Sequence, residues 1–164
     1  MSYDQLLKGR FSLPGNFYGI TTVTLRRNQI FDDFRNARIL IGELRRLHDS
    51  GAVFSFARVV MPDHLHWMFQ LEQSKKLSEV IRLLKGRSAR RLNQLHHEKS
   101  TAWQSGFYEH VVRQSEDLRQ MAHYVLQNPI RAGLVGDLGK YPWWDACWLW
   151  ENDQAARAAG AMFD

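Results

Sequence analysis

Cysteine and long hydrophobic runs are the two features that this sequence most clearly lacks. Cys147 is the only cysteine among 164 residues, which excludes an intramolecular disulfide and a zinc site made of several thiolates. No uncharged stretch approaches the ~20 residues that a helix needs to cross a bilayer, and the first residues lack the apolar segment of a signal peptide. We therefore expect a soluble protein of the reducing cytoplasm.

Acidic side chains are in the minority. Lysine and arginine outnumber aspartate and glutamate by 22 to 17, and the isoelectric point is about 9.6. This balance favours a polyanionic partner, nucleic acid first and an anionic membrane surface second. A hydrophobic content of 45% predicts one domain over residues 1–164, with an N-terminal arm at 1–15 and an aromatic-rich C-terminal tail at 136–164.

Four segments have the composition of β-strands. Residues 17–25 are rich in β-branched and aromatic side chains, and residues 107–112 have a similar pattern. Residues 53–60 and 64–71 are apolar runs separated by Met61-Pro62-Asp63, whose turn chemistry predicts a hairpin. His64 and His66 thus open the second strand of that hairpin.

Three segments follow a helical period. Asp32 or Asp33 can cap the first helix, which Gly51 should end. Its apolar positions recur at intervals of three and four residues: Phe34, Ala37, Ile41 and Leu44.

The other two helices come later in the chain. A long apolar stripe over 77–95 predicts the second, interrupted by Gly86 and Ser88. Ser115 can cap the third, and Pro129 should end it. The order is then βαββαβ followed by a terminal helix, which is the α+β, ferredoxin-like arrangement with helices on one face of an antiparallel sheet.

The His64-Leu65-His66 motif is the most informative in the chain. Alternate residues of a strand share a face at a rise of roughly 3.3 Å per residue, so the two imidazoles project about 6.6 Å apart. This spacing lets both histidines bind one metal ion. The alternative is a pair of ordinary surface or hydrogen-bonded histidines.

Tyr124 and Asn128 are the residues that could complete a site around such an ion. They lie four residues apart in the third predicted helix and so share one face of it. If that helix packs beside the histidine strand, Asn128 is a candidate third ligand and the Tyr124 phenol is a candidate nucleophile. Alternatively, Tyr124 is a half-buried helix residue and Asn128 only ends the helix before Pro129.

Phosphodiester chemistry on DNA would use this set of residues. A divalent ion held by neutral His-His-Asn ligands keeps its full charge for the phosphate oxygens and the departing alkoxide. Proximity to the cation favours the phenolate of a tyrosine, which activates it. The product would be a covalent phosphotyrosine that a DNA hydroxyl can reverse, as in a transposase or a nicking-and-joining enzyme.

These residues resemble the HUH single-tyrosine transposases, and within them the REP-associated tyrosine transposases. The similarity rests on His64-Leu65-His66 after Met61-Pro62-Asp63, and on Tyr124 and Asn128 in the later helix. It extends through Gly106-Phe107-Tyr108-Glu109-His110, residues 124–135 and Tyr141-Pro142-Trp143. Many insertion-sequence relatives have glutamine where Asn128 stands, whereas asparagine is usual in the REP-associated branch.

The resemblance implies a function in detail. His64, His66 and Asn128 would bind Mg²⁺ or Mn²⁺, and Tyr124 would attack the scissile phosphate. The expected partners are single-stranded DNA hairpins formed by repetitive extragenic palindromes, with no small-molecule cofactor and no membrane. The expected location is the cytoplasm at the nucleoid. A monomer is expected, although insertion-sequence relatives pair as dimers.

Two other functions stay open at the level of sequence. A hairpin-binding protein without catalysis would regulate or organise repeat DNA. A metallohydrolase acting on small substrates would need a water-activating carboxylate, which no spacing provides.

Basic residues supply the candidate DNA contacts. Seven crowd around the second predicted helix, between residues 75 and 91: Lys75, Lys76, Arg82, Lys85, Arg87, Arg90 and Arg91. They would position a hairpin stem through its phosphates, although such a run is otherwise a solvated helix face. Arg10, Arg26 and Arg27 are candidates for the unpaired flank. Trp143, Trp144, Trp148 and Trp150 could stack on unpaired bases or pack on the sheet.

Overall fold

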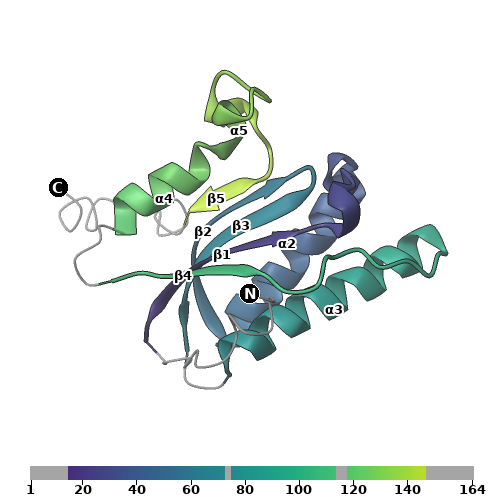
Figure 1. Ribbon diagram of the computed structural model, residues 1–164, viewed down its shortest axis with the longest axis horizontal. Coiled ribbons are helices and arrows are strands. Elements are labelled where there is room, and N and C mark those ends of the chain that lie inside the picture. The colour runs from purple at the N-terminus through teal and green to yellow at the C-terminus, as the bar shows by residue number, and fades with distance from the viewer. Residues whose placement is uncertain (1–14, 73–74, 114–117, 147–164) are drawn as a thin grey trace, which may run out of the picture.

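The strands form a single antiparallel sheet. The computed structural model describes residues 15–72, 75–113 and 118–146. Its strands are β1 (Phe17–Val23), β2 (Val53–Met61), β3 (His64–Leu71), β4 (Tyr108–Val111) and β5 (Trp144–Ala146). They pair in the order β4-β1-β3-β2-β5 (Figure 1). The first four strands have the predicted ferredoxin-like order, which confirms the α+β fold class.

Four α-helices accompany the sheet in the described residues. They are α2 (Phe34–Asp49), α3 (Leu77–His96), α4 (Leu118–Leu126) and the single turn α5 (Asn128–Arg131). Short 3₁₀ turns lie at Leu25–Arg27, Ile30–Asp32 and Leu138–Lys140. In Figure 1, α2 and α3 lie together on one side of the sheet, and α4 lies on the other. None of the helices among the described residues is long and apolar enough to span a membrane.

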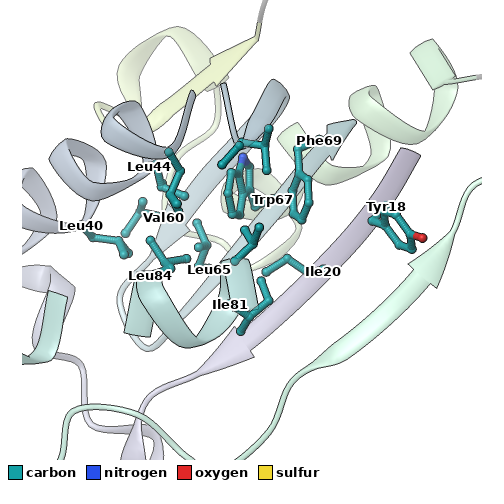
Figure 2. Packing of buried hydrophobic residues seen from close by; sticks show 14 of the residues in the cluster. Tyr18, Ile20, Leu40, Leu44, Val60, Leu65, Trp67, Phe69, Ile81 and Leu84 are labelled. Carbon is teal, nitrogen blue, oxygen red and sulfur yellow. The ribbon is translucent and has the colours of Figure 1, made fainter. Parts of the chain in front are cut away.

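The main core lies between the sheet and the pair α2 and α3. Figure 2 shows Leu40 and Leu44 of α2 and Leu84 of α3 directed toward Leu65 and Trp67 of the sheet, all of them fully buried. Burying each such side chain contributes roughly 1.5–3 kcal/mol. The Trp67 indole N–H donates to Ser55 Oγ at 2.9 Å, so its one polar atom is satisfied inside the core.

Successive side chains of β3 alternate between the face of the sheet that packs on α2 and α3 and the face that packs on α4. Leu65, Trp67 and Phe69 enter the main core, so His64, His66 and Met68 point to the other side. There Met68 packs against Ala122 and Leu126 of α4 in a second, smaller cluster. The histidines and α4 therefore share one face of the sheet.

Strand β5 was not predicted, because three residues in an aromatic-rich tail carry no visible period. It pairs with β2 through Ala57↔Ala146 and Val59↔Trp144. The Arg58 guanidinium and the Asp145 carboxylate form an ion pair at 2.6 Å between the two strands. Tyr141 adds a link just before β5, since its hydroxyl donates to the Val60 carbonyl at 2.6 Å.

Several predicted details were wrong. Strand β1 ends at Val23 rather than 25, because Arg26 and Arg27 adopt left-handed φ values of 55° and 53° and turn the chain. Helix α3 runs unbroken through Gly86 and Ser88. Phe34, expected in the core stripe, is 57% exposed because it is the first residue of α2, and its ring lies against Trp143.

The limits of two later elements also differ from the prediction. Strand β4 covers residues 108–111 instead of 107–112. Helix α4 ends at Leu126, before Pro129, and Asn128 begins the separate turn α5. Ser115, the predicted cap of this helix, lies outside the described residues.

Candidate active site

The two histidines of β3 meet at their outer ring nitrogens. His64 Nε2 and His66 Nε2 lie 3.0 Å apart, and the ring centroids are 4.7 Å apart at 88°. Both rings are partly buried beside the β2–β3 turn. The predicted convergence of the pair is therefore present in the structure.

Each histidine is oriented by an oxygen atom at its inner nitrogen. His64 Nδ1 lies 2.6 Å from Asp63 Oδ1, and because an ionised carboxylate only accepts, this Nδ1 is the donor. His66 Nδ1 lies 2.8 Å from the Thr21 hydroxyl, which can accept its proton. In these tautomers both Nε2 atoms present lone pairs toward the same point. Such outer hydrogen bonds are typical of metal-binding histidines.

The protonation state of His66 suits ligation. Burial lowers the pKa of His66 to about 4, helped by the charges of His64 and Arg131. The ring is thus neutral near pH 7, which is the form that binds metals. Asp63 is also kept ionised: burial opposes its charge, but hydrogen bonds and charges from His64 and Arg27 lower its pKa.

The two imidazole nitrogens fit a divalent metal ion whose third protein ligand is neither a histidine, a cysteine nor a carboxylate. Within the residues that the structure describes, no group of three or more histidine, cysteine, aspartate or glutamate side chains could hold a metal ion. Two facing imidazole nitrogens, His64 Nε2 and His66 Nε2, remain as the donors. The third ligand predicted by the sequence is an amide, Asn128.

Asn128 is half-buried and held by its own amide nitrogen. Nδ2 donates to the Val125 carbonyl at 2.7 Å, so Oδ1 is the end left for an ion. Its position in α5 instead of α4 changes little, because Gln127 between the two helices keeps a right-handed helical conformation. Its role as a ligand stays a prediction.

The end of α4 lies near the histidines. Val125 packs into the cluster of Val59, Met61 and Tyr141. In the sheet, Val59 is directly opposite His66, and Met61 is directly opposite His64. Residues opposite each other on neighbouring strands share a face, so the last turn of α4 adjoins the face that carries the pair.

Tyr124 occupies this last turn and is 67% exposed. The Arg131 guanidinium carbon lies 3.9 Å from the centre of its ring. The same arginine contributes to the lowered pKa of His66. Helix α4, which carries Tyr124, is on the histidine side of the sheet, and the role of Tyr124 as nucleophile stays a prediction.

Sequence reasoning overlooked Tyr108. This residue is directly opposite Thr21 of β1, which is itself directly opposite His66. The three residues form one row across the sheet, and Tyr108 is 69% exposed. Had the pairing of β4 with β1 been predicted, Tyr108 would have been placed beside Thr21. Tyr108 is the second exposed tyrosine on the histidine face.

The candidate DNA-binding side chains lie in different surroundings. Helix α3, which carries five of them and follows directly after Lys75 and Lys76, is in the layer opposite the histidines. Lys85 is half-buried, and its ammonium donates to the carbonyls of Gln104 and Gly106. Burial lowers the pKa of Lys85 to about 8. This lysine ties a loop to the helix, so the expectation of a free phosphate-binding side chain does not fit its contacts.

Three further basic residues are engaged with carboxylates. Arg91 pairs with Glu43 at 3.0 Å, Lys75 with Glu79 at 3.3 Å, and Arg27 with Asp63 at 3.2 Å. The remaining described candidates are exposed: Arg26, Lys76, Arg82, Arg87 and Arg90. Arg10 lies outside the described residues, as do Trp148 and Trp150. Trp143 and Trp144 are half-buried against the sheet, which supports packing for these two.

Comparisons with known proteins agree with this arrangement. Residues 16–128 match the family model described as "Transposase IS200 like". A Haemophilus influenzae protein assigned as a REP-associated tyrosine transposase is 30% identical over 94 residues, covering 51% of this chain and 53% of that protein. The Escherichia coli REP-associated tyrosine transposase is 29% identical over 87 residues, covering 52% and 50%. The chain thus spans about half the length of these curated relatives.

A solved structure shares the fold. It is a REP-associated tyrosine transposase bound to a REP hairpin, and it aligns with a TM-score of 0.72 at 23% identity. The alignment covers 88% of this chain and 82% of the other. The resemblance found in the motifs is therefore matched by family, by relatives and by fold.

Proposed function

Because the chain belongs to the IS200-like transposase family, we propose that it is a metal-dependent single-stranded DNA endonuclease and strand transferase. Its substrates are hairpins formed by repetitive extragenic palindromes, as the names of its relatives suggest. The observation that carries the proposal is the histidine pair, with both Nε2 atoms at one point and α4 on the same face. It works in the cytoplasm at the nucleoid, as a monomer.

His64, His66 and Asn128 would hold Mg²⁺ or Mn²⁺. The bound ion would neutralise charge that develops on the phosphate oxygens and on the leaving oxygen. Asp63 and Thr21 keep the imidazoles in position, so the pair needs little rearrangement before an ion binds. Imidazoles alone would suit zinc or manganese better than magnesium, and the expectation of Mg²⁺ rests on the family.

Tyr124 performs the covalent step. Its Oη attacks the scissile phosphorus, a bond forms between Oη and phosphorus, and the bond from phosphorus to one deoxyribose oxygen breaks. The phenolic proton passes to solvent, and the departing oxygen takes up a proton. The phosphotyrosine retains the energy of the broken bond, so a DNA hydroxyl can attack it, release Tyr124 and join a new strand.

A denaturing gel with a labelled hairpin oligonucleotide tests the proposal. With Mn²⁺, the wild-type chain should form a protein–DNA adduct that survives denaturation, and a chelator should abolish it. Tyr124→Phe should bind the hairpin but form no adduct. Tyr108→Phe is the matched control and should keep the reaction. An adduct formed by Tyr124→Phe would refute the assignment.

A hairpin-binding protein without catalysis is the second candidate. The structure favours it in one respect, since exposed arginines on α3 lie in a different layer from the histidines. Tight binding of the same oligonucleotide with no cleavage in Mg²⁺, Mn²⁺ or any other divalent ion would establish this alternative.

A further inference from the structure

Arg131 is a charged residue that lies against the proposed nucleophile, Tyr124. It ends the single turn α5, which Asn128 begins. Backbone bonds from Arg131 N to Gln127 O at 3.0 Å and from Ala132 N to Asn128 O at 2.9 Å close this turn. Buried Pro129 packs inside it. The arginine is thus fixed relative to the candidate ligand three residues before it.

The side chain of Arg131 folds back over α4. Its guanidinium carbon is 3.9 Å from the centre of the Tyr124 ring, which is close to van der Waals contact between two flat groups. By comparison, Arg38 lies 5.5 Å from the Phe34 ring on α2. Stacking uses the face of a guanidinium and leaves its N–H groups directed outward in the plane. A contact of this kind leaves the hydrogen-bond donors of Arg131 available.

The charge of Arg131 lacks a carboxylate partner among residues 15–72, 75–113 and 118–146. Arg27 and Arg58, by contrast, pair with Asp63 and Asp145. Moreover, α5 follows the last turn of α4, whose Val125 packs against Val59 and Met61, the residues directly opposite His66 and His64. The Arg131 guanidinium and a metal ion held by His64 and His66 would together create a positive potential at the site. A phosphate of the substrate would bind favourably to both charges.

We propose that Arg131 is a catalytic residue that binds a non-bridging oxygen of the scissile phosphate through its N–H groups while its flat face holds the Tyr124 ring for attack. This inference rests on the proposed function. The arginine places nucleophile and phosphate side by side and stabilises the charge that develops on the oxygen. Removing one such donor lowers reaction rates by about 10²–10³-fold.

The test measures single-turnover adduct formation at saturating hairpin in Mn²⁺. Arg131→Gln removes the charge and the five-donor fork, and we expect about a 10²-fold slower rate with hairpin affinity within a few-fold of wild type. Arg131→Lys should recover only part of the rate, because an ammonium neither stacks flat nor donates as a fork. Arg38→Gln, which also removes an arginine beside an aromatic ring, should react like wild type.

A modified substrate separates phosphate binding from a merely structural role. Replacing one non-bridging oxygen of the scissile phosphate by methyl gives two diastereomers. Wild type should react with the two diastereomers at different rates. In Arg131→Gln this rate difference should largely disappear, because the variant no longer contacts the oxygen that distinguishes them. An unfolded variant would show itself by circular dichroism, and Arg131→Lys then supplies the same readout.

The outcomes are distinct. A wild type that forms adduct, together with an Arg131→Gln variant of equal rate or unchanged isomer preference, would overturn the role of Arg131 and leave the proposed function standing. A wild type that forms no adduct under any divalent ion would overturn both.

Discussion

Two short hydrogen bonds prepare the histidine pair at the scale of single residues. Asp63 lies next to His64 in the chain, whereas Thr21 reaches His66 from 45 residues away. Both contacts orient a ring through Nδ1 and leave Nε2 available. The affinity for a metal ion should therefore depend on residues that never touch the ion.

Thr21→Val tests this dependence. The valine retains the shape of the side chain but removes the hydroxyl that fixes the His66 ring, so Mn²⁺ affinity should fall about 10–100-fold. Titration calorimetry with Mn²⁺ alone measures it.

Thr22→Val is the adjacent control on β1. The Thr22 hydroxyl is buried on the opposite face and has no hydrogen-bond partner among the described residues, so its removal should leave Mn²⁺ affinity unchanged and cost no stability. Equal affinity of Thr21→Val and wild type would mean that the threonine does not orient the ring.

The spacing of His64 and His66 was sufficient to predict that they share a face, because strand alternation is local. The contact between Thr21 and His66 was not predictable, since it depends on the register between β1 and β3. Tyr108 was overlooked for the same reason: its row is set by the pairing of β4 with β1. Sequence patterns give the face of a residue, and only the assembled sheet gives its neighbours.

At the scale of elements, α2 and α3 are joined by a buried carboxylate. Glu43 is 1% exposed, and its Oε1 contacts Arg91 of α3 at 3.0 Å and Arg46 of its own helix at 3.5 Å. Its second oxygen, Oε2, has no hydrogen-bond partner within the part of the chain that the structure describes. Loss of this carboxylate would leave Arg91 without its partner in the interface between the helices.

Glu43→Ala should lower the free energy of unfolding by about 2–3 kcal/mol, somewhat less than for fully buried pairs because both arginines are partly exposed. Glu79→Ala breaks the exposed Lys75 pair and should cost about 0.5 kcal/mol or less. Urea denaturation measures both variants. Similar losses for the two would show that the buried pair contributes little.

Element limits were the least predictable part of the fold. Gly86 and Ser88 do not interrupt α3, because the buried Ser88 hydroxyl accepts a hydrogen bond from the Trp103 indole at 2.9 Å. This contact spans 15 residues and leaves no local signal. Conversely, α4 ends at Leu126, and Pro129 lies in the first turn of α5, where its missing N–H would have no partner within the helix.

At the scale of the whole molecule, the sheet separates the candidate active site from the exposed arginines of α3. The histidines and Tyr124 lie on the side of α4, and the exposed arginines of α3 lie on the other. A DNA hairpin that contacts both must pass around an edge of the sheet. Positive charge on the far layer would then contribute to affinity without affecting cleavage chemistry.

Salt dependence of hairpin binding tests this arrangement. Each phosphate contact adds roughly 0.7–0.9 to the slope of log affinity against log salt. Replacing Arg87 and Arg90 by glutamine should therefore reduce the slope by about 1.5, and replacing both by lysine, which keeps the charge, should preserve it. A slope that glutamine leaves unchanged would show that DNA does not reach α3.

The most direct test of the whole account is to locate the residue that becomes bonded to DNA. Wild-type protein reacted with the hairpin in Mn²⁺ and digested with trypsin separates the candidates, since residues 120–131 contain Tyr124 and residues 100–113 contain Tyr108. Tandem mass spectrometry should find the nucleotide on Tyr124. A nucleotide on Tyr108 or elsewhere, or cleaved DNA with both new ends free of protein, would contradict the account.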